Sequence, residues 1–192
     1  MFAKGTVSWR VQLPVIPEPV AVSLDPRTTA LLSLDMVESL CPQRVRCMEG
    51  VPAAAVLLEL AREHGVLVVH TGTSAQVTDV APQPGEIVIR GNGPDKFVET
   101  NLDSSLRRRG IDTLVIQGFA ADRAVMYTAM DATMRGYTVV VPADASPGSA
   151  TPFDALVAHY QLLTQTGRTN VENAPLAEEA VTLTRTDLIT FR

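Results

Sequence analysis

Apolar residues fall into short, nearly continuous runs separated by longer segments of helical composition. The runs are typical of strands buried on both faces, and they predict strands at residues 30–34, 66–70, 86–90, 113–117 and 137–141. Residues 181–183 form a sixth strand or a final edge of the sheet. Helices are expected between the runs, at residues 52–64, 100–109, 122–135 and 153–166. This alternation predicts βαβ units and a parallel sheet covered on both faces.

The N-terminal part of the chain follows neither pattern. Four prolines lie between residues 11 and 28, at positions 14, 17, 19 and 26, and they exclude both a helix and a central strand. We expect residues 1–28 to form an extended arm laid over the core or a neighbouring subunit. With 192 residues, 46% of them hydrophobic, the chain has the size of one ordinary domain, and we expect residues 1–192 to fold as one.

Composition argues against two classes of partner. The formal net charge of −5 argues against nucleic acid, because binding to phosphate draws its affinity from clustered Lys and Arg side chains. The one basic run, residues 107–109, fits the last turn of a helix. No segment approaches the roughly 20 apolar residues of a membrane span, and residues 1–10 lack the apolar core of a signal peptide. We therefore expect a soluble cytoplasmic protein with no membrane or nucleic-acid partner.

Cysteine and histidine give no support for a metal or redox site. Cys41 and Cys47 form neither a CxxC pair nor the paired arrangement of a structural zinc site, and we expect two free thiols. The three histidines, His64, His70 and His159, show no spacing that suits a metal. The sequence therefore supports no metal site and no cofactor.

Candidate site residues follow the predicted strands, because the ligand crevice of an open parallel sheet lies outside the carboxyl ends of its strands. The residues at these exits are Asp35, His70, Arg90, residues 118–124 and Asp144. Asp35 comes directly after a buried run, where partial desolvation raises the pKa of a carboxyl group unless a nearby cation lowers it. Such a group can move protons. Alternatively, Asp35 caps a loop or pairs with an arginine.

Two further features could complete a site with this aspartate. The loop after the third strand carries Arg90 and Lys96, and either could bring positive charge to the carboxylate or to a substrate oxygen, or remain surface charge. The small residues Ala120, Ala121 and Ala124 lie where the fourth strand leads into a helix, so unpaired N–H groups there could bind an oxyanion or a carboxylate. Alternatively, these alanines only permit close packing of the helix and the sheet.

Several motifs, in a fixed order, cover most of the chain. They are Ala30-Leu31-Leu32-Ser33-Leu34-Asp35-Met36, Phe97-Val98-Glu99-Thr100-Asn101-Leu102 and residues 110–118, followed by Val125, Thr128-Ala129, Asp131-Ala132, Gly136-Tyr137 and Asp144-Ala145. In these motifs the sequence resembles the isochorismatase-like superfamily of hydrolases, also called the cysteine hydrolases. The resemblance implies a six-stranded parallel sheet in a three-layer α/β/α sandwich, a small-molecule substrate, and assembly as a homodimer or homotetramer.

The resemblance also implies roles for single residues. Most of the family combines an Asp as acid and base, a Lys that orients and polarises, and a nucleophilic Cys at a helix N-terminus. Asp35 matches the first. Either Lys96 or Arg90 takes the second role, although counting along the loop places the family's Lys on Gly91. Phe97, in a matching motif, is expected to contact the substrate together with the three alanines.

The family's Cys falls on Ala124. A methyl group cannot attack a carbonyl, so a thioester route through this position is closed. This holds unless alanine has been substituted for a natural cysteine, and we favour the natural alanine. Cys41, which follows the aspartate by six residues, either supplies a thiol from another direction or is a free structural thiol.

The sequence leaves three hypotheses about function. In the first, the protein hydrolyses an amide or a vinyl ether in a small metabolite through Asp35, with Arg90 or Lys96 and the amides near residues 120–124. A vinyl ether needs only an acid and water for this. In the second, the protein is a catalytically silent family member that binds a metabolite or a protein partner. In the third, Cys41 is the nucleophile.

Overall fold

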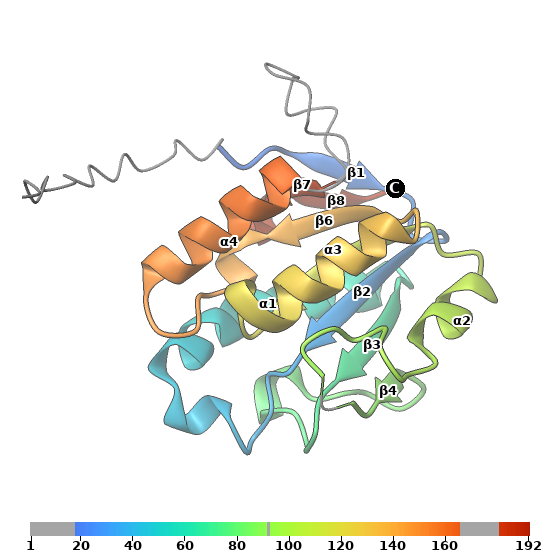
Figure 1. Ribbon diagram of the computed structural model, residues 1–192. Helices are drawn as coiled ribbons and strands as arrows, with labels where there is room; N and C mark the ends of the chain where they lie inside the picture. The colour runs from blue at the N-terminus through green and yellow to red at the C-terminus, as the bar shows by residue number, and fades with distance from the viewer. Residues whose placement is uncertain (1–17, 92, 166–180) are drawn as a thin grey trace, which may run out of the picture.

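Six parallel strands form the central sheet of the protein (Figure 1). The computed structural model describes residues 18–91, 93–165 and 181–192. The strands are β2 (Thr29–Leu34), β3 (Leu67–Thr71), β4 (Ile87–Ile89), β5 (Thr113–Gly118), β6 (Thr138–Pro142) and β7 (Val181–Thr184). They lie in the order β4-β3-β2-β5-β6-β7, and all neighbouring pairs are parallel. The predicted six-stranded parallel sheet is confirmed, and the segment at 181–184 is its sixth strand.

Helices cover both faces of this sheet. They are α1 (Val45–Glu63), α2 (Leu102–Arg107), α3 (Met126–Met134) and α4 (Pro152–Gln165), with short 3-10 helices η1 (Cys41–Gln43), η2 (Thr78–Val80), η4 (Ala143–Ala145) and η6 (Thr186–Leu188) and a π-helical turn, η3 (Ala121–Val125). Buried residues of α1 share one hydrophobic cluster with Leu31, whereas those of α2, α3 and α4 share another with Ala30 and Leu32. Since successive strand residues point to opposite faces, the two clusters lie on opposite sides of the sheet. In Figure 1, α3 and α4 lie in front of the sheet.

Helix α1 begins at Val45 and not at Pro52, so the predicted start of this helix is wrong. Pro52 lies inside the helix, on its exposed side. A proline there removes one backbone hydrogen bond, but the side of the helix that packs on the sheet is continuous through it. The buried residues of α1 are Cys47, Gly50, Val51, Ala54, Leu57, Leu58 and Ala61. Burial of this stripe offsets the lost hydrogen bond.

Part of the predicted arm is a strand. β1 (Val22–Leu24) pairs in parallel with β8 (Ile189–Phe191), which the sequence analysis did not predict, in a separate two-stranded sheet. Ile189 and Phe191 are buried in the same cluster as α1. The pair therefore ties residues 22–24 to the C-terminal end of the chain and covers the α1 side of the molecule. Residues 1–17 of the predicted arm lie outside the described residues.

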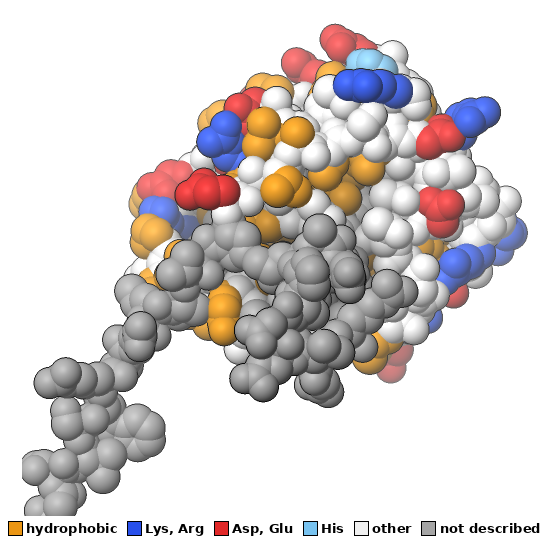
Figure 2. Space-filling view, turned by 90° about the horizontal axis from the view of Figure 1, so that it is seen from above, with side chains coloured by type: hydrophobic (Ala, Val, Ile, Leu, Met, Phe, Trp, Pro, Cys, Tyr) orange, Lys and Arg blue, Asp and Glu red, His pale blue; other side chains and the backbone are white. Residues whose placement is uncertain are grey.

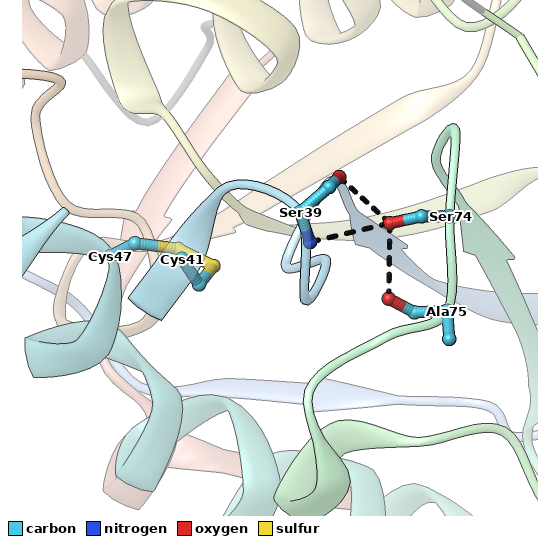
Figure 3. Close-up of a disulfide and its surroundings, with 5 residues drawn as sticks. All are labelled: Ser39, Cys41, Cys47, Ser74 and Ala75. Atoms are coloured by element: carbon cyan, nitrogen blue, oxygen red, sulfur yellow. Dashed lines mark hydrogen bonds between the residues drawn. A yellow bond between two sulfur atoms is a disulfide. The ribbon is translucent and has the colours of Figure 1, made fainter. Parts of the chain in front are cut away.

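Cys41 and Cys47 form a disulfide (Figure 3), so the expectation of two free thiols is wrong. Helix η1 and the first turn of α1 fold the chain back on itself, and the two Cα atoms lie 5.1 Å apart, within the range that a disulfide spans. Both residues are completely buried. A sulfur held in this bond is not a free nucleophile, and the hypothesis of catalysis by Cys41 is therefore wrong.

The surface carries mixed charge. Figure 2 looks down on one face, where acidic and basic side chains lie near one another toward the edge and hydrophobic side chains lie between them. Within the described ranges, no helix is long and apolar enough to cross a bilayer.

Candidate active site

The site lies where the winding of the sheet reverses, between β2 and β5. Leu34, the last residue of β2, pairs with Gly118, the last residue of β5. A Cβ atom on Gly118 would collide with the carbonyl oxygen of Leu34, and the backbone φ of this glycine is +137°. Only glycine fits here. The close approach brings the residues after both strands, Asp35 and Phe119, to one place at the carboxyl edge of the sheet, where open α/β proteins bind ligands.

Asp35 holds an ion pair at this edge. Its carboxylate oxygen Oδ2 lies 2.6 Å from Nζ of Lys96, and the lysine side chain is 3% exposed. The Thr71 hydroxyl, at the end of β3, donates to the other carboxylate oxygen over 3.4 Å. The backbone of Asp35 has a φ of +54°, a left-handed conformation that Asp adopts more readily than most residues. The turn therefore points the carboxylate away from the strand and toward the lysine.

The loop after β4 brings Lys96, and not Arg90, to the aspartate. The backbone N–H of Lys96 donates to the Thr128 hydroxyl on α3 over 3.1 Å, and its Nζ also donates to the carbonyl oxygen of Gly93 over 2.8 Å. These contacts fix the side chain at both ends. Arg90 is exposed and donates to the carbonyl oxygen of Thr73 instead.

Burial and the ion pair act on Asp35 in opposite directions. Burial raises the pKa of this carboxyl, whereas hydrogen bonding and attraction from Lys96, and a weaker hydrogen bond from Thr71, lower it. Burial dominates, and the net result is a pKa above the usual value of 3.8. A carboxyl group with a raised pKa beside a fixed cation suits proton transfer.

A cavity of about 570 Å³ opens beside Asp35. Its walls come from the segments that follow the strands, together with the start of α1. The lining residues are Asp35, Leu40, Arg44, Gly93, Pro94, Phe119, Ala120, Arg123, Ala124, Ser149 and Ala150. Its volume suits a small metabolite.

The segment after β5 forms one wall of the cavity. Ala120 and Ala124 line it, whereas Ala121 is completely buried and does not. Three amides of the segment donate within the protein: that of Ala121 to Pro147, and those of Arg123 and Val125 to the carbonyl oxygen of Ala120. The segment is further tied down by Asp122, whose carboxylate accepts two hydrogen bonds from Ser149 over 2.8 and 2.7 Å. The wall is thus held by backbone hydrogen bonds and by the carboxylate of Asp122.

Phe97 and Cys41, both predicted site residues, lie outside the lining. Phe97 is buried in the core cluster of α2 and α3, where its ring stacks on Tyr137 with 5.9 Å between centroids. Cys41 is buried in its disulfide, although its neighbour Leu40 lines the cavity. Figure 3 shows a contact that anchors the segment before Cys41: the hydroxyls of Ser39 and Ser74 form a hydrogen bond of 2.8 Å.

Arg44 and Ser149 line the cavity but were not among the candidate residues, and Arg123 was included only as part of residues 118–124, without a role of its own. Arg123 lies inside the segment that the sequence analysis selected, and its position beside Ala124 was a usable signal. Neither Arg44 nor Ser149 follows a predicted strand directly, and nothing in the local pattern distinguishes them. Among the described residues, no group of three or more His, Cys, Asp or Glu side chains could hold a metal ion.

Fold and site together define an open α/β protein with a ligand cavity at the switch point of its sheet. The model of the isochorismatase domain matches residues 29–168, and the chain belongs to that family. Its fold is shared with a cysteine hydrolase from Pseudomonas syringae pv. phaseolicola 1448A, with a TM-score of 0.73 and 19% identity over 90% of this chain and 95% of that one.

Two curated relatives are similar in sequence. The ureidoacrylate amidohydrolase RutB of Stutzerimonas stutzeri (strain A1501) is 38% identical over 90 residues, which cover 47% of this chain and 36% of that protein. The maleamate amidohydrolase of Pseudomonas putida KT2440 is 30% identical over 149 residues, which cover 60% of this chain and 70% of that protein. The match thus spans about a third of the first relative and most of the second.

Proposed function

We propose that the protein hydrolyses a small metabolite with Asp35 as acid and base, Lys96 as its charged partner, and water as the nucleophile. The observation that carries this proposal is the 2.6 Å ion pair between Asp35 and Lys96, beside a cavity that Ala124 also lines. A carboxyl group there can move a proton, but the side chain at position 124 cannot form a bond to the substrate.

These residues suit the cleavage of a vinyl ether. In this reaction the protonated Asp35 gives its proton to the terminal vinyl carbon, and the electron pair of the double bond forms the new C–H bond. Water then adds to the oxygen-stabilised cation and returns a proton to the carboxylate. The resulting hemiketal separates into a carbonyl compound and an alcohol, so one water is consumed and the acid is restored. Lys96 stabilises the carboxylate while its proton is away.

An amide substrate is the second candidate, favoured by the names of the two amidohydrolases to which the chain is similar. The route is harder, because water must attack an unreactive carbonyl without a covalent intermediate. In this case Asp35 takes the proton from water and later gives it to the leaving nitrogen. Ala120 and Ala124 both line the cavity, and we infer that their backbone N–H groups would meet the developing oxyanion.

The test is the replacement of the proposed acid. Wild-type protein is assayed against a panel of carboxylated vinyl ethers and amides, beside Asp35→Asn and the matched control Asp79→Asn, whose side chain is exposed. We expect Asp35→Asn to lower kcat by at least about 100-fold, the range of a lost acid–base group, with KM little changed. Turnover by Asp35→Asn at the wild-type rate, or none by wild type, would leave the silent binding protein as the better hypothesis.

The pH dependence of kcat gives a second, independent test of Asp35 as the acid. An acid acts in its protonated form, so kcat is expected to fall as pH rises through the pKa of Asp35. Lys96 lowers that pKa, and Lys96→Met therefore moves this alkaline limb to higher pH while lowering the maximum rate. A limb that stays in place in Lys96→Met contradicts the assignment of the acid to Asp35.

A further inference from the structure

The cavity beside Asp35 is lined by two cationic residues that the proposed reaction does not use. Arg44 and Arg123 both line it, and Asp35 is the one acidic residue among its described lining residues. Asp35 is already paired with Lys96, so these two charges offset one another. The two guanidinium groups therefore give the cavity a net positive charge.

Neither arginine has an ion-pair partner within 4 Å in the part of the chain that the structure describes. The nearby acids are engaged elsewhere. Asp122 accepts hydrogen bonds from Ser149. Asp154 accepts the amides of Thr151 and Ala150 over 2.6 and 3.0 Å, and these amides lower its pKa more than Arg123 does. The two guanidinium groups remain open to a ligand.

Both arginines stand on backbone that is held in place. Arg44 is the residue before α1, and it lies inside the loop closed by the Cys41–Cys47 disulfide. Its N–H donates to the carbonyl oxygen of Cys41 over 2.8 Å. Arg123 lies in η3 directly before Ala124, and its N–H donates to Ala120 over 2.9 Å. Because the backbone at both arginines is already fixed, less conformational entropy is lost when the two side chains become ordered around a bound anion.

We propose that Arg44 and Arg123 form an anion subsite that binds a carboxylate of the substrate and so orients its reacting bond toward Asp35. The inference rests on the proposed function in taking this cavity as the catalytic one. Guanidinium groups match the planar carboxylate with paired N–H donors. Two such groups in one cavity select small carboxylic acids over neutral compounds of the same shape, and a substrate with two carboxylates can use both.

The experiment measures binding and needs no turnover. Succinate, fumarate, maleate and benzoate are titrated calorimetrically into the wild-type protein at low ionic strength, each beside its neutral amide. At least one acid is expected to bind ten times more tightly than its amide, and its affinity falls as sodium chloride is added. Equal affinity for every acid and its amide overturns the subsite.

Variants then test whether Arg44 and Arg123 are the residues that bind the carboxylate. Arg44→Ala and Arg123→Ala are each expected to weaken binding of the selected acid at least tenfold while leaving the affinity for its amide unchanged. Arg44→Lys and Arg123→Lys restore part of the loss, because charge returns without the paired donors. Arg108→Ala removes an exposed arginine outside the cavity and leaves the affinity unchanged. A loss in Arg108→Ala as large as in the other two overturns the assignment.

Failure of the subsite and failure of the proposed function give different results. Acid binding that depends on both arginines, without hydrolysis of any substrate, supports the subsite and contradicts the hydrolase. Hydrolysis that depends on Asp35, with no preference for acids and with KM unchanged in both arginine variants, supports the hydrolase and contradicts the subsite.

Discussion

At the scale of a single residue, the proposed absence of a covalent route depends on Ala124. Its methyl group lines the cavity at the start of the helical segment after β5, the place where a thiol would be activated by helix N–H groups. We expect Ala124→Cys to gain amidase activity and to be labelled once by an electrophilic amide analogue, measured by mass spectrometry. Ala129→Cys, completely buried on α3, controls for the presence of a thiol. Labelling without any amidase activity would show that the rest of the cavity does not suit amides.

Gly118 is the residue on which the position of the site depends. Gly118→Ala is expected to lower the free energy of unfolding by roughly 3 kcal/mol, from a clash with the backbone of Leu34 and a strained φ. Gly85→Ala is the matched control, because Gly85 also has a positive φ, +96°, but no atom lies within 4 Å of its added Cβ. We expect it to cost only about 1–2 kcal/mol. Equal losses in urea unfolding would mean that strain alone, and not contact with β2, accounts for the glycine.

Among the elements, strands were predicted better than helix ends and loops. A strand buried on both faces requires an unbroken apolar run, and the six short apolar runs of this sequence are difficult to interpret as any other element. The start of α1 was missed because Pro52 suits a first turn equally well. β8 (Ile189–Phe191) was missed because the polar Thr190 interrupts its short apolar run and because its partner, β1, comes from the other end of the chain.

The candidate site was predictable only where a side chain directly follows a strand. Asp35 meets this condition, since the end of β2 fixes its place. Lys96 lies six residues beyond Arg90 in an irregular loop, where no periodicity fixes which cation reaches the aspartate. The places of Arg44 and Arg123 depend on how η1 and η3 turn, and such turns are settled by tertiary contacts.

Arg62 joins α1 to the segment before β4. Its side chain donates to both carboxylate oxygens of Glu86, over 2.8 and 3.1 Å, and to the carbonyl oxygen of Ala81 over 3.0 Å. Glu86 also contacts the buried ring of His70 over 2.9 Å. We expect Arg62→Ala to lower the free energy of unfolding at pH 7 by roughly 1–3 kcal/mol. The control Arg108→Ala, at an exposed position, is expected to lower it by only about 0.5 kcal/mol or less.

The same pair predicts how the loss depends on pH. Burial raises the pKa of Glu86, but hydrogen bonds from Arg62, the Gln83 amide and His70 lower it more, to about 2. Its contribution is therefore complete above its unfolded pKa near 4.5 and declines as pH falls toward 2. Urea unfolding of wild type and Arg62→Ala is expected to give a difference that narrows between pH 5 and pH 3. A difference that stays constant over this range contradicts the role of the ion pair.

For the whole molecule, His159 links stability to acidity. Burial on α4 lowers its pKa to about 4, from an ordinary value of 6.5. Between these values the unfolded chain binds a proton that the folded protein does not, so stability falls as pH decreases from 6.5 to 4. The cumulative loss is roughly 3 kcal/mol at 1.36 kcal/mol per pH unit. The free energy of unfolding is measured by urea titration at pH 7 and pH 4.5. Between these values it should change less in His159→Leu than in wild type. In His64→Leu, at an exposed position, it should change as much as in wild type.

In the cavity wall after β5, the residues that hold the backbone in place are different from those proposed to determine the reaction. Contacts of Gly118 with Leu34 and of the Ala121 amide with Pro147 hold the backbone. Ala124 is buried in the core cluster of α2, α3 and α4, whereas the side chain of Arg123 is exposed and contributes little to that hold. A library randomised at position 123 and restricted to small residues at position 124 should therefore yield mostly folded proteins with different catalytic repertoires, whereas one randomised at Gly118 should yield almost none. Such a scaffold can evolve a new activity through one codon without first acquiring a new architecture.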